Sequence, residues 1–412
     1  MEQIRYRVKE RVLSELDFSK VSSDEEIEGY IDRYILEESQ NKNLSLANKL
    51  RLRTELFNSI RRYDVLTELL ERKDITEIMI NGHNSIFVEC NGRLEKTDIA
   101  FESEERLFAI IQQIVAGCNR RINESSPICD ARLADGSRVN IVINPISLNG
   151  HAVTIRKFPD KEITMEKLIE IGSVSKTVSR LLQLFVEAKY NIIVSGGTGS
   201  GKTTFLNALS NYIPKDERII TIEDSAELRL IGVENLVRLE TRNANVEGNN
   251  AVSIRDLIKS SLRMRPDMII VGEVRDAAAI DMISAMNTGH DGSLSTLHSN
   301  SAGDALLRLE TMYLMGLEIP VQAIRRQLSS AVDIIIHLGR LRDKSRKVLN
   351  ISEVLGMNNG EIRLNSLFEF VEEDCEKNRV LGTLTKVNDL VSVNKLIGRG
   401  LLNKYEEICK GF

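Results

Sequence analysis

Gly196-Gly197-Thr198-Gly199-Ser200-Gly201-Lys202-Thr203 decides the fold of this 412-residue chain. The stretch fits the pattern G-x-x-x-x-G-K-[ST], whose backbone N–H groups curl around the phosphates of a nucleotide. Residues 191–194 before it predict a short buried strand, and residues 204–212 after it predict an amphipathic helix. Glycines let the backbone approach the phosphates closely, and the helix N-terminus adds positive potential. The stretch therefore predicts a nucleoside triphosphate site in an α/β domain.

The loop also carries the two side chains that this chemistry needs. Lys202 can reach the β- and γ-phosphates, and the Thr203 hydroxyl can hold Mg²⁺. The residues expected to bind the nucleotide are Gly196, Gly197, Thr198, Gly199, Ser200, Gly201, Lys202, Thr203 and Thr204.

Composition limits the remaining choices. The length predicts two or three domains, and the net charge of −5 argues against general binding to a polyanion. Five cysteines are scattered without a C-x-x-C pair, which favours neither a zinc site nor a disulfide framework and indicates a reducing cytoplasm. Neither a run of about 20 apolar residues nor a signal-peptide core occurs, so we expect any membrane contact to come through partners.

Residues 1–60 are charged and have helical periodicity. The apolar stripes expected there are Ile4, Val8 and Val12, and Leu46, Leu50, Phe57 and Ile60. Ser23 and Glu26 predict a capping box that begins a helix. Both a structural bundle and a docking module for a partner fit this segment.

Residues 61–159 predict a mixed α/β domain. We expect a hairpin around Asn91-Gly92, an amphipathic helix over 107–115, a second hairpin from 128–133 and 138–143, and a strand over 153–158. A three-residue loop with Gly136 in the left-handed conformation would make Arg132 and Arg138 face each other. A two-residue loop at Asp135-Gly136 would put them on opposite faces. Pro159-Asp160-Lys161 reads as a linker.

From residue 160 onward, strands alternate with helices, which is typical of a parallel sheet. The strands expected after the loop are 219–222, 268–271, 293–297 and 334–336, followed by an antiparallel hairpin of 347–353 with 361–364. Polar residues follow three of these strands, where doubly wound sheets bind their ligands.

Each of these strand ends has a candidate role. One of Glu223 and Asp224 is expected to face the nucleotide while the other caps the next turn. Glu273 can bind Mg²⁺ through water or align the attacking water. His298 fits a γ-phosphate sensor, whereas the role of His290 stays open. These histidines lack a clear third ligand for a metal site.

These motifs together resemble the type II/type IV secretion-system ATPases, and within them the CpaF-like ATPases of Tad (tight adherence) pili. The resemblance covers nearly the whole chain after residue 60. It lies in 130–133 (DARL), 135–140 (DGSRVN), 154–158 (TIRKF), the phosphate loop, 221–228 (TIEDSAEL), 265–267 (RPD), 272–275 (GEVR), 288–298 (TGH to the second histidine) and 351–354 (ISEV). The four-cysteine element of type II secretion ATPases is absent from the sequence.

The resemblance implies a homo-hexameric ring of RecA-like domains (160–412), each with a PAS-like domain (61–159) and here an extra helical segment (1–60). ATP and Mg²⁺ would bind between the two larger domains. Arg138 and Arg156 match the arginines that close on the phosphates, and Arg132 is a lesser candidate. Glu223 and Glu273 match the catalytic acids, with the principal one left open, and His298 matches the histidine-box sensor.

The function implied is a cytoplasmic motor at the inner face of the cell membrane that works on a membrane-embedded pilus platform. Assembly and retraction both stay open. The rival is a conjugative type IV secretion ATPase or a RecA-like nucleic-acid motor. A DNA translocase should show a basic, aromatic-bearing groove. Because aromatic residues make up only 5% of an acidic chain, we expect no direct nucleic-acid partner.

Overall fold

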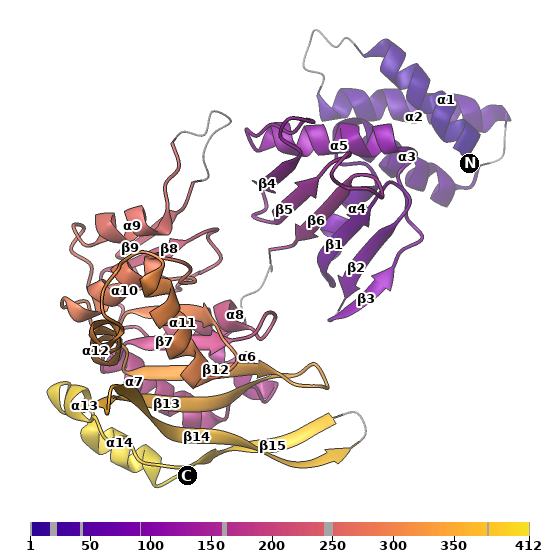
Figure 1. The fold of residues 1–412 in the computed structure, drawn as a ribbon. Coiled ribbons are helices and arrows are strands. Elements are labelled where there is room, and N and C mark those ends of the chain that lie inside the picture. The colour runs from indigo at the N-terminus through magenta and orange to yellow at the C-terminus, as the bar shows by residue number, and fades with distance from the viewer. Residues whose placement is uncertain are drawn as a thin grey trace. The chain divides into compact units, whose positions relative to one another are not determined.

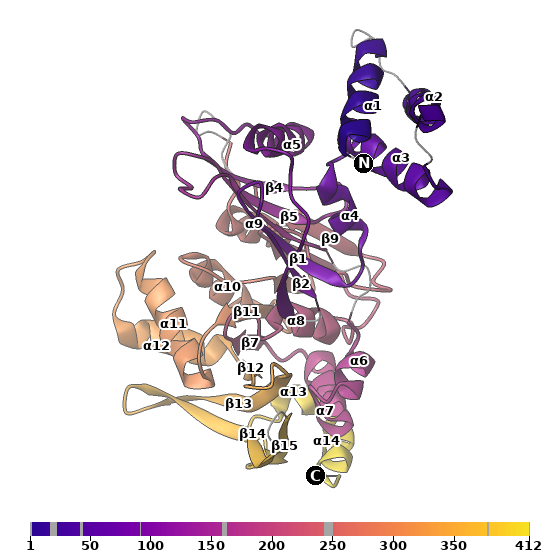
Figure 2. The same cartoon turned by 90° about the vertical axis from the view of Figure 1, so that its right-hand side faces the viewer.

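The computed structural model describes residues 2–16, 23–41, 44–90, 92–158, 163–242, 250–376 and 379–411. The chain divides into two compact units, Met1–Asp160 and Lys161–Phe412, which are described separately here (Figures 1 and 2). The expected linker, Pro159-Asp160-Lys161, lies outside the described residues.

The first unit begins with three helices, α1 (Glu2–Glu15), α2 (Asp24–Asn41) and α3 (Leu46–Arg61). The predicted capping box is confirmed, since Glu26 N donates to Ser23 Oγ over 3.2 Å and Ser23 N donates to Glu26 Oε2 over 3.0 Å. The first predicted stripe is confirmed as core. The side chains that fill this bundle include Ile4, Val8, Val12, Ile27, Ile31, Leu52, Leu56 and Phe57.

The stripe predicted for the third helix is wrong in its first half. Leu46 and Leu50 are 74% and 54% exposed, while Leu52 and Leu56 are buried in their place. Both pairs have helical spacing, and the choice between them depends on which face of α3 meets α1 and α2. Tertiary packing decided it.

The rest of the first unit is a six-stranded antiparallel sheet with helices. Its elements are α4 (Val65–Glu71), β1 (Ile75–Asn81), β2 (Ile86–Cys90), β3 (Arg93–Lys96), α5 (Glu104–Gly117), β4 (Ile128–Arg132), β5 (Arg138–Val142) and β6 (Ala152–Arg156), and the strand order is β3-β2-β1-β6-β5-β4. The apolar face of α5 shares a core with the sheet, and the Ser103 side chain caps this helix. Both predicted hairpins and the predicted helix are confirmed, although Asn91 lies outside the described residues.

The β4–β5 turn settles the choice that the sequence left open. Arg132 and Arg138 are direct cross-strand partners, and Gly136 has φ +91°. Leu133 N donates to Ser137 O over 2.9 Å, which closes the three-residue loop. The alternative with the loop Ala134-Asp135-Gly136 is therefore the observed one, and the two arginines share one face of the sheet.

The second unit is a nine-stranded mixed sheet with helices on both faces. Its elements are α6 (Met165–Glu170), α7 (Lys176–Glu187), β7 (Ile192–Gly196), α8 (Lys202–Ser210), β8 (Ile219–Glu223), β9 (Leu236–Glu240), α9 (Ile254–Ser261), β10 (Met268–Val271), α10 (Ala278–Asn287), β11 (Leu294–His298), α11 (Ala302–Leu314), α12 (Val321–Ala331), β12 (Ile334–Arg340), β13 (Arg346–Asn358), β14 (Glu361–Glu376), β15 (Arg379–Lys386), α13 (Asn394–Gly398) and α14 (Leu402–Cys409). The strand order is β15-β14-β13-β12-β7-β11-β10-β8-β9.

The strands from β12 to β9 in this order are parallel, and β13, β14 and β15 extend the sheet in antiparallel fashion. One apolar core joins α6, α7, α8, α13 and α14 to one face, and another joins α9 to α12 to the other face. The predicted parallel sheet is thus confirmed. The strands β9 and β15 and the two C-terminal helices were not predicted.

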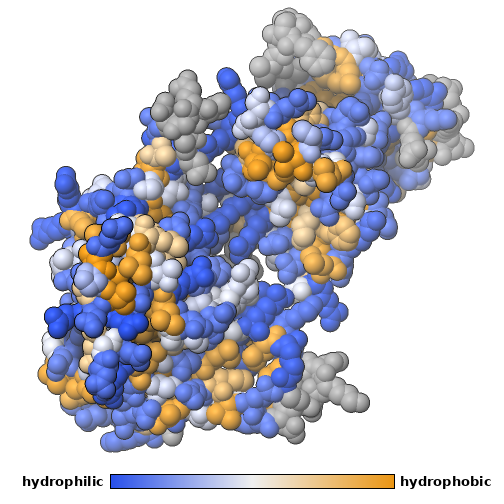
Figure 3. All heavy atoms as spheres, viewed as in Figure 1, coloured by the Kyte–Doolittle hydropathy of each residue, from blue (hydrophilic) through white to orange (hydrophobic). Residues whose placement is uncertain are grey.

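Among the described residues, every helix is too short or too polar to cross a bilayer. The face in Figure 3 is largely hydrophilic, with apolar residues gathered in several separate patches.

Candidate functional site

The phosphate loop connects β7 to α8, as the motif predicts. Gly201 has φ +90° and directly precedes α8, so the chain turns into the helix at a conformation that favours glycine. A Cβ on Gly196 would lie 2.5 Å from Leu338 O, so only glycine fits between β7 and β12 there. Lys202 Nζ donates to Gly197 O over 3.0 Å. The lysine ammonium therefore lies inside the curl of the loop.

His298 lies beside this lysine because β11 runs parallel to β7. The register pairs His298 with Gly196, and Lys202 Nζ is 3.2 Å from His298 Nδ1. Burial lowers the pKa of His298, with the Lys202 charge adding to this effect and the Glu273 carboxylate opposing it. The imidazole is thus neutral near pH 7, with Nδ1 as an acceptor for the lysine and Nε2–H as a donor.

Glu273 follows β10 and lies on the other side of the His298 ring from Lys202. His298 Nε2 is 3.1 Å from Glu273 Oε1, and Arg275 Nη2 is 2.6 Å from Glu273 Oε2. Arg275 Nη1 also lies 3.5 Å from Asp224 Oδ2, at the end of β8. The ends of β7, β11, β10 and β8 therefore carry one continuous chain of charged and polar contacts.

Glu223 is the buried acid of the pair after β8. Its Oε1 accepts from the backbone N–H groups of Glu227 and Leu228, each over 2.9 Å, so Glu223 itself caps the next turn. Its Oε2 has no hydrogen-bond partner among the described residues. Burial raises the pKa of Glu223 to about 6, against the lowering effect of those N–H groups. Asp224 is exposed and pairs with Arg275 instead of capping.

This donor set fits a hydrated Mg²⁺ bound with a triphosphate. Thr203 offers a hydroxyl at the start of α8, and Glu273 and Glu223 offer carboxylate oxygens at neighbouring strand ends. The described residues contain no cluster of three histidine, cysteine or carboxylate side chains close enough to hold a metal by themselves. Mg²⁺ usually keeps several waters and takes few protein ligands beside phosphates, so sparse ligation suits it.

A second group of candidate residues lies in the first unit. Arg138 is the cross-strand partner of both Arg132 and Arg156, so the three arginines form a row across β4, β5 and β6. Arg132 Nε donates to Gly136 O over 3.2 Å, and Arg138 Nε is buried. Arg156 is also paired with Glu77 on β1, but its Nε lies 3.9 Å from the Glu77 carboxylate.

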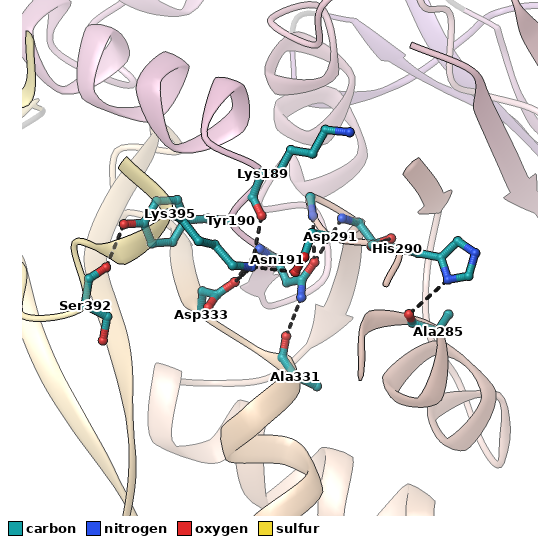
Figure 4. A network of polar contacts seen from close by, with 12 residues as sticks. Lys189, Tyr190, Asn191, Ala285, His290, Asp291, Ala331, Asp333, Ser392 and Lys395 are labelled. Carbon is teal, nitrogen blue, oxygen red and sulfur yellow. Dashed lines mark hydrogen bonds and ion pairs between the residues drawn. The ribbon is translucent and has the colours of Figure 1, made fainter. Parts of the chain in front are cut away.

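His290 does not belong to the site. His290 precedes β11, whereas His298 is the last residue of β11, so the two histidines lie at opposite ends of this strand. His290 Nδ1 is 3.3 Å from Ala285 O (Figure 4). Figure 4 also shows Asn191 and Lys395 at the end of the parallel strands where His290 lies, and there Lys395 Nζ contacts Asp333 Oδ2 over 2.8 Å.

Two residues near the loop were not expected from the sequence. Arg346 Nε donates to Gly199 O over 2.8 Å, and Arg340 lies beside the same glycine. No local motif marks them, because their place depends on how β12 pairs with β7 and how β13 pairs with β12.

Comparisons with known proteins agree with this geometry. Residues 61–400 match the family described as Type II/IV secretion system protein. A putative conjugal transfer protein of Mycobacterium tuberculosis is 33% identical over 313 residues, covering 74% of this chain and 87% of that protein. The conjugal transfer protein TrbB of Rhizobium radiobacter is 32% identical over 317 residues, covering 76% of this chain and 93% of that protein.

A solved structure supports the fold. The pilus retraction motor PilT with bound ADP aligns with a TM-score of 0.51 at 21% sequence identity, covering 84% of this chain and 88% of that chain. The family model spans the whole of the second unit's parallel sheet and most of the first unit. This chain belongs to the type II/IV secretion system protein family.

Proposed function

We propose that this chain is a Mg²⁺-dependent ATPase that converts hydrolysis into mechanical work on a secretion or pilus machine. The observation that carries the proposal is the contact chain from Lys202 through His298 to Glu273, which joins the phosphate loop to a carboxylate two strands away. Family membership and the fold of PilT support the same function.

Each side chain of the site has a separate role in the binding and hydrolysis of ATP. Lys202 and the loop N–H groups bind the β- and γ-phosphates. Mg²⁺, held by Thr203 and by Glu273 directly or through water, neutralises charge on the phosphates. Glu273 also orients and polarises the attacking water, with Glu223 as the second acid, and His298 reports the γ-phosphate to both. The neutral imidazole suits this role because it can donate and accept hydrogen bonds at once.

The arginine row of the first unit supplies further positive charge. We infer that Arg138 and Arg156 close on the phosphates of ATP, with Arg132 as a lesser contributor, in a PAS-like domain of residues 61–159. A guanidinium fork matches phosphate oxygens in pairs, which a single ammonium cannot do. Closure of one unit on the other would couple the nucleotide state to motion.

For the assembly we propose a homo-hexameric ring in the cytoplasm, at the inner face of the membrane, that drives a CpaF-like Tad pilus platform. The separate helical segment of residues 1–60 has its own core and suits a docking module. Two relatives are conjugal transfer proteins, which favours a second candidate, an ATPase of a conjugal transfer system. Loss of pili on gene deletion would support the first, and loss of plasmid transfer the second.

Enzyme assays test the shared core of both candidates. The purified full chain should release phosphate from ATP only with Mg²⁺, and Lys202→Ala should not. Light scattering of Glu273→Gln with ATP and Mg²⁺ should show a hexamer. Absence of Mg²⁺-dependent turnover in the wild type would overturn the ATPase proposal, and a monomer with and without ATP would overturn the ring.

A further inference from the structure

The β12–β13 hairpin places two arginines against the phosphate loop. Arg340 ends β12, Arg346 begins β13, and the two are cross-strand partners. Arg346 Nε donates to the Gly199 carbonyl oxygen over 2.8 Å. Arg340 Nη1 lies 3.6 Å from the position that a Cβ would take on Gly199. Both side chains are exposed, so a ligand in the loop can approach them.

Strand pairing explains why they lie there. Because β12 runs parallel to β7 with Leu338 opposite Gly196, the next turn of the chain passes beside the start of the loop. The stem of Arg346 packs over the end of the loop, with its Cδ 3.3 Å from the Cβ position of Gly201. The hairpin thus contacts the loop just where it enters α8.

The turn between Arg340 and Arg346 is bound to the C-terminal strands β14 and β15. Asp343 Oδ1 accepts from Ser345 N, and its Oδ2 accepts from Val380 N on β15, each over 2.9 Å. Arg342 Nη1 donates to Glu372 Oε2 on β14 over 3.0 Å. These contacts hold the turn that Arg340 and Arg346 flank against β14 and β15.

The hydrogen bond from Arg346 also fixes the direction of a loop N–H group. In a trans peptide, the Gly199 C=O and the Ser200 N–H point in opposite directions, and the described cis peptide is elsewhere, at Asn144-Pro145. With the carbonyl on Arg346, Ser200 N donates across the loop to Gly197 O over 3.3 Å. The Lys202 ammonium contacts that same oxygen.

We propose that Arg346, supported by Arg340, is a positioning residue for the triphosphate. It holds the Gly199–Ser200 peptide in the conformation in which Ser200 N bonds to Gly197 O, and it adds positive charge at the mouth of the loop. Among the described residues, the terminal nitrogens of Arg346 make no hydrogen bond or ion pair. This inference rests on the proposed ATPase function, because it needs a triphosphate in the loop.

The test compares three variants of the full chain. Arg346→Met removes the donor and keeps an unbranched stem, and Arg346→Lys keeps one donor. Lys344→Met is the matched control, since it removes an exposed cation from the turn of the same hairpin, where its side chain makes no hydrogen bond or ion pair among the described residues. The readouts are binding of fluorescent ATP and AMP analogues, KM and kcat for ATP, and the melting temperature.

Arg346→Met should weaken binding of the ATP analogue by about tenfold or more, as expected for the loss of a charge-assisted hydrogen bond. KM should rise while kcat stays near that of the wild type, and Arg346→Lys should recover most of the affinity. Binding of the AMP analogue should change little, because the loop holds the phosphates that AMP lacks. Lys344→Met should match the wild type.

The outcomes separate this inference from the proposed function. If Lys202→Ala loses ATP binding but Arg346→Met binds normally, the positioning role is wrong and the ATPase proposal stands. Equal losses for ATP and AMP with a lower melting temperature would show a merely structural role and overturn the inference. If the wild type itself binds no ATP, both proposals fail.

Discussion

Gly272 lies directly against Glu223 where β10 and β8 end side by side. A Cβ on Gly272 would be 3.0 Å from Glu223 Cγ and 3.4 Å from its Oε1. Gly272 N also donates to Ile222 O over 2.8 Å, which keeps the two strand ends together. The absence of a side chain at residue 272 therefore lets the buried acid and Glu273 occupy neighbouring strand ends.

This contact predicts that Gly272→Ala displaces Glu223. Gly272 is not in the left-handed region, so the effect of the methyl group is steric and not conformational. Overpacking of this kind costs about 1–3 kcal/mol of unfolding free energy. We expect a lower melting temperature and reduced ATP turnover, measured on the same preparation.

Gly303→Ala is the matched control. A Cβ there would meet nothing closer than Ser301 Oγ at 3.8 Å, and the residue lies in α11. Alanine should be neutral or stabilising by up to about 1 kcal/mol at a helical position. Unchanged stability and turnover in Gly272→Ala would show that the Glu223 side chain can move aside at no cost.

The raised pKa of Glu223 predicts a pH dependence of stability. Burial raises this pKa from 4.5 to about 6, so the folded chain binds this proton more tightly than the unfolded chain. The stabilisation from the proton is complete below pH 4.5 and is lost as the pH rises through 6, by about 2 kcal/mol. Glu223→Gln, which can still accept from the Glu227 and Leu228 N–H groups, should escape this loss.

Amide hydrogen exchange in β8 can measure the effect. At pH 7.5 the Gln variant should be more protected than the wild type, and the difference should shrink toward pH 4.5. Comparing the two proteins at each pH cancels other groups, including His298. A difference that does not change with pH would show that the acid has an ordinary pKa.

The contact chain Lys202–His298–Glu273 predicts that substitutions of its two end residues, Lys202 and Glu273, impair different steps of the reaction. Lys202→Ala should abolish turnover and sharply weaken ATP binding, because the ammonium inside the loop is lost. Glu273→Gln should keep ATP bound while stopping hydrolysis, because an amide polarises water poorly. Equilibrium binding and single-turnover hydrolysis separate the two cases. Near-normal hydrolysis by Glu273→Gln would transfer the principal role to Glu223.

Local sequence patterns were enough to predict much of the fold and the central residues of the site. The strand, loop and helix around Lys202 follow from glycine spacing and apolar runs, and the strands ending at Glu223 and before Glu273 are buried throughout. Such segments can be recognised from their apolar runs alone. The edge strand β9 cannot be recognised in this way, because none of its residues is fully buried.

What the sequence could not provide depends on contacts between distant segments. One case is the choice of which acid, Glu223 or Asp224, caps the turn after β8, because capping by Glu223 depends on how residues 224–228 fold back. The positions of Arg340 and Arg346 are another, because they follow from the register of β12 against β7. Periodicity likewise could not choose between Leu50 and Leu52 as the buried side of α3.

The arginine row on the first unit carries the last prediction. Arg138 lies between Arg132 and Arg156 on one sheet face, and the Arg156 side chain is 62% exposed, so an anion can reach this end of the row. If these residues act as arginine fingers, their removal should cost turnover more than binding, by about 10³-fold or more. Lysine is a poor substitute because a point charge cannot replace the guanidinium fork.

We therefore expect Arg138→Lys and Arg156→Lys to bind a fluorescent ATP analogue nearly normally and to hydrolyse ATP poorly. Arg93→Lys on β3 is a suitable control, since this exposed arginine lies on the opposite edge strand of the same sheet from β4. If the arginines are ordinary solvated residues, each substitution should change stability by less than about 1 kcal/mol and leave catalysis intact. Normal turnover in both variants would mean that the nucleotide state reaches the first unit by another route.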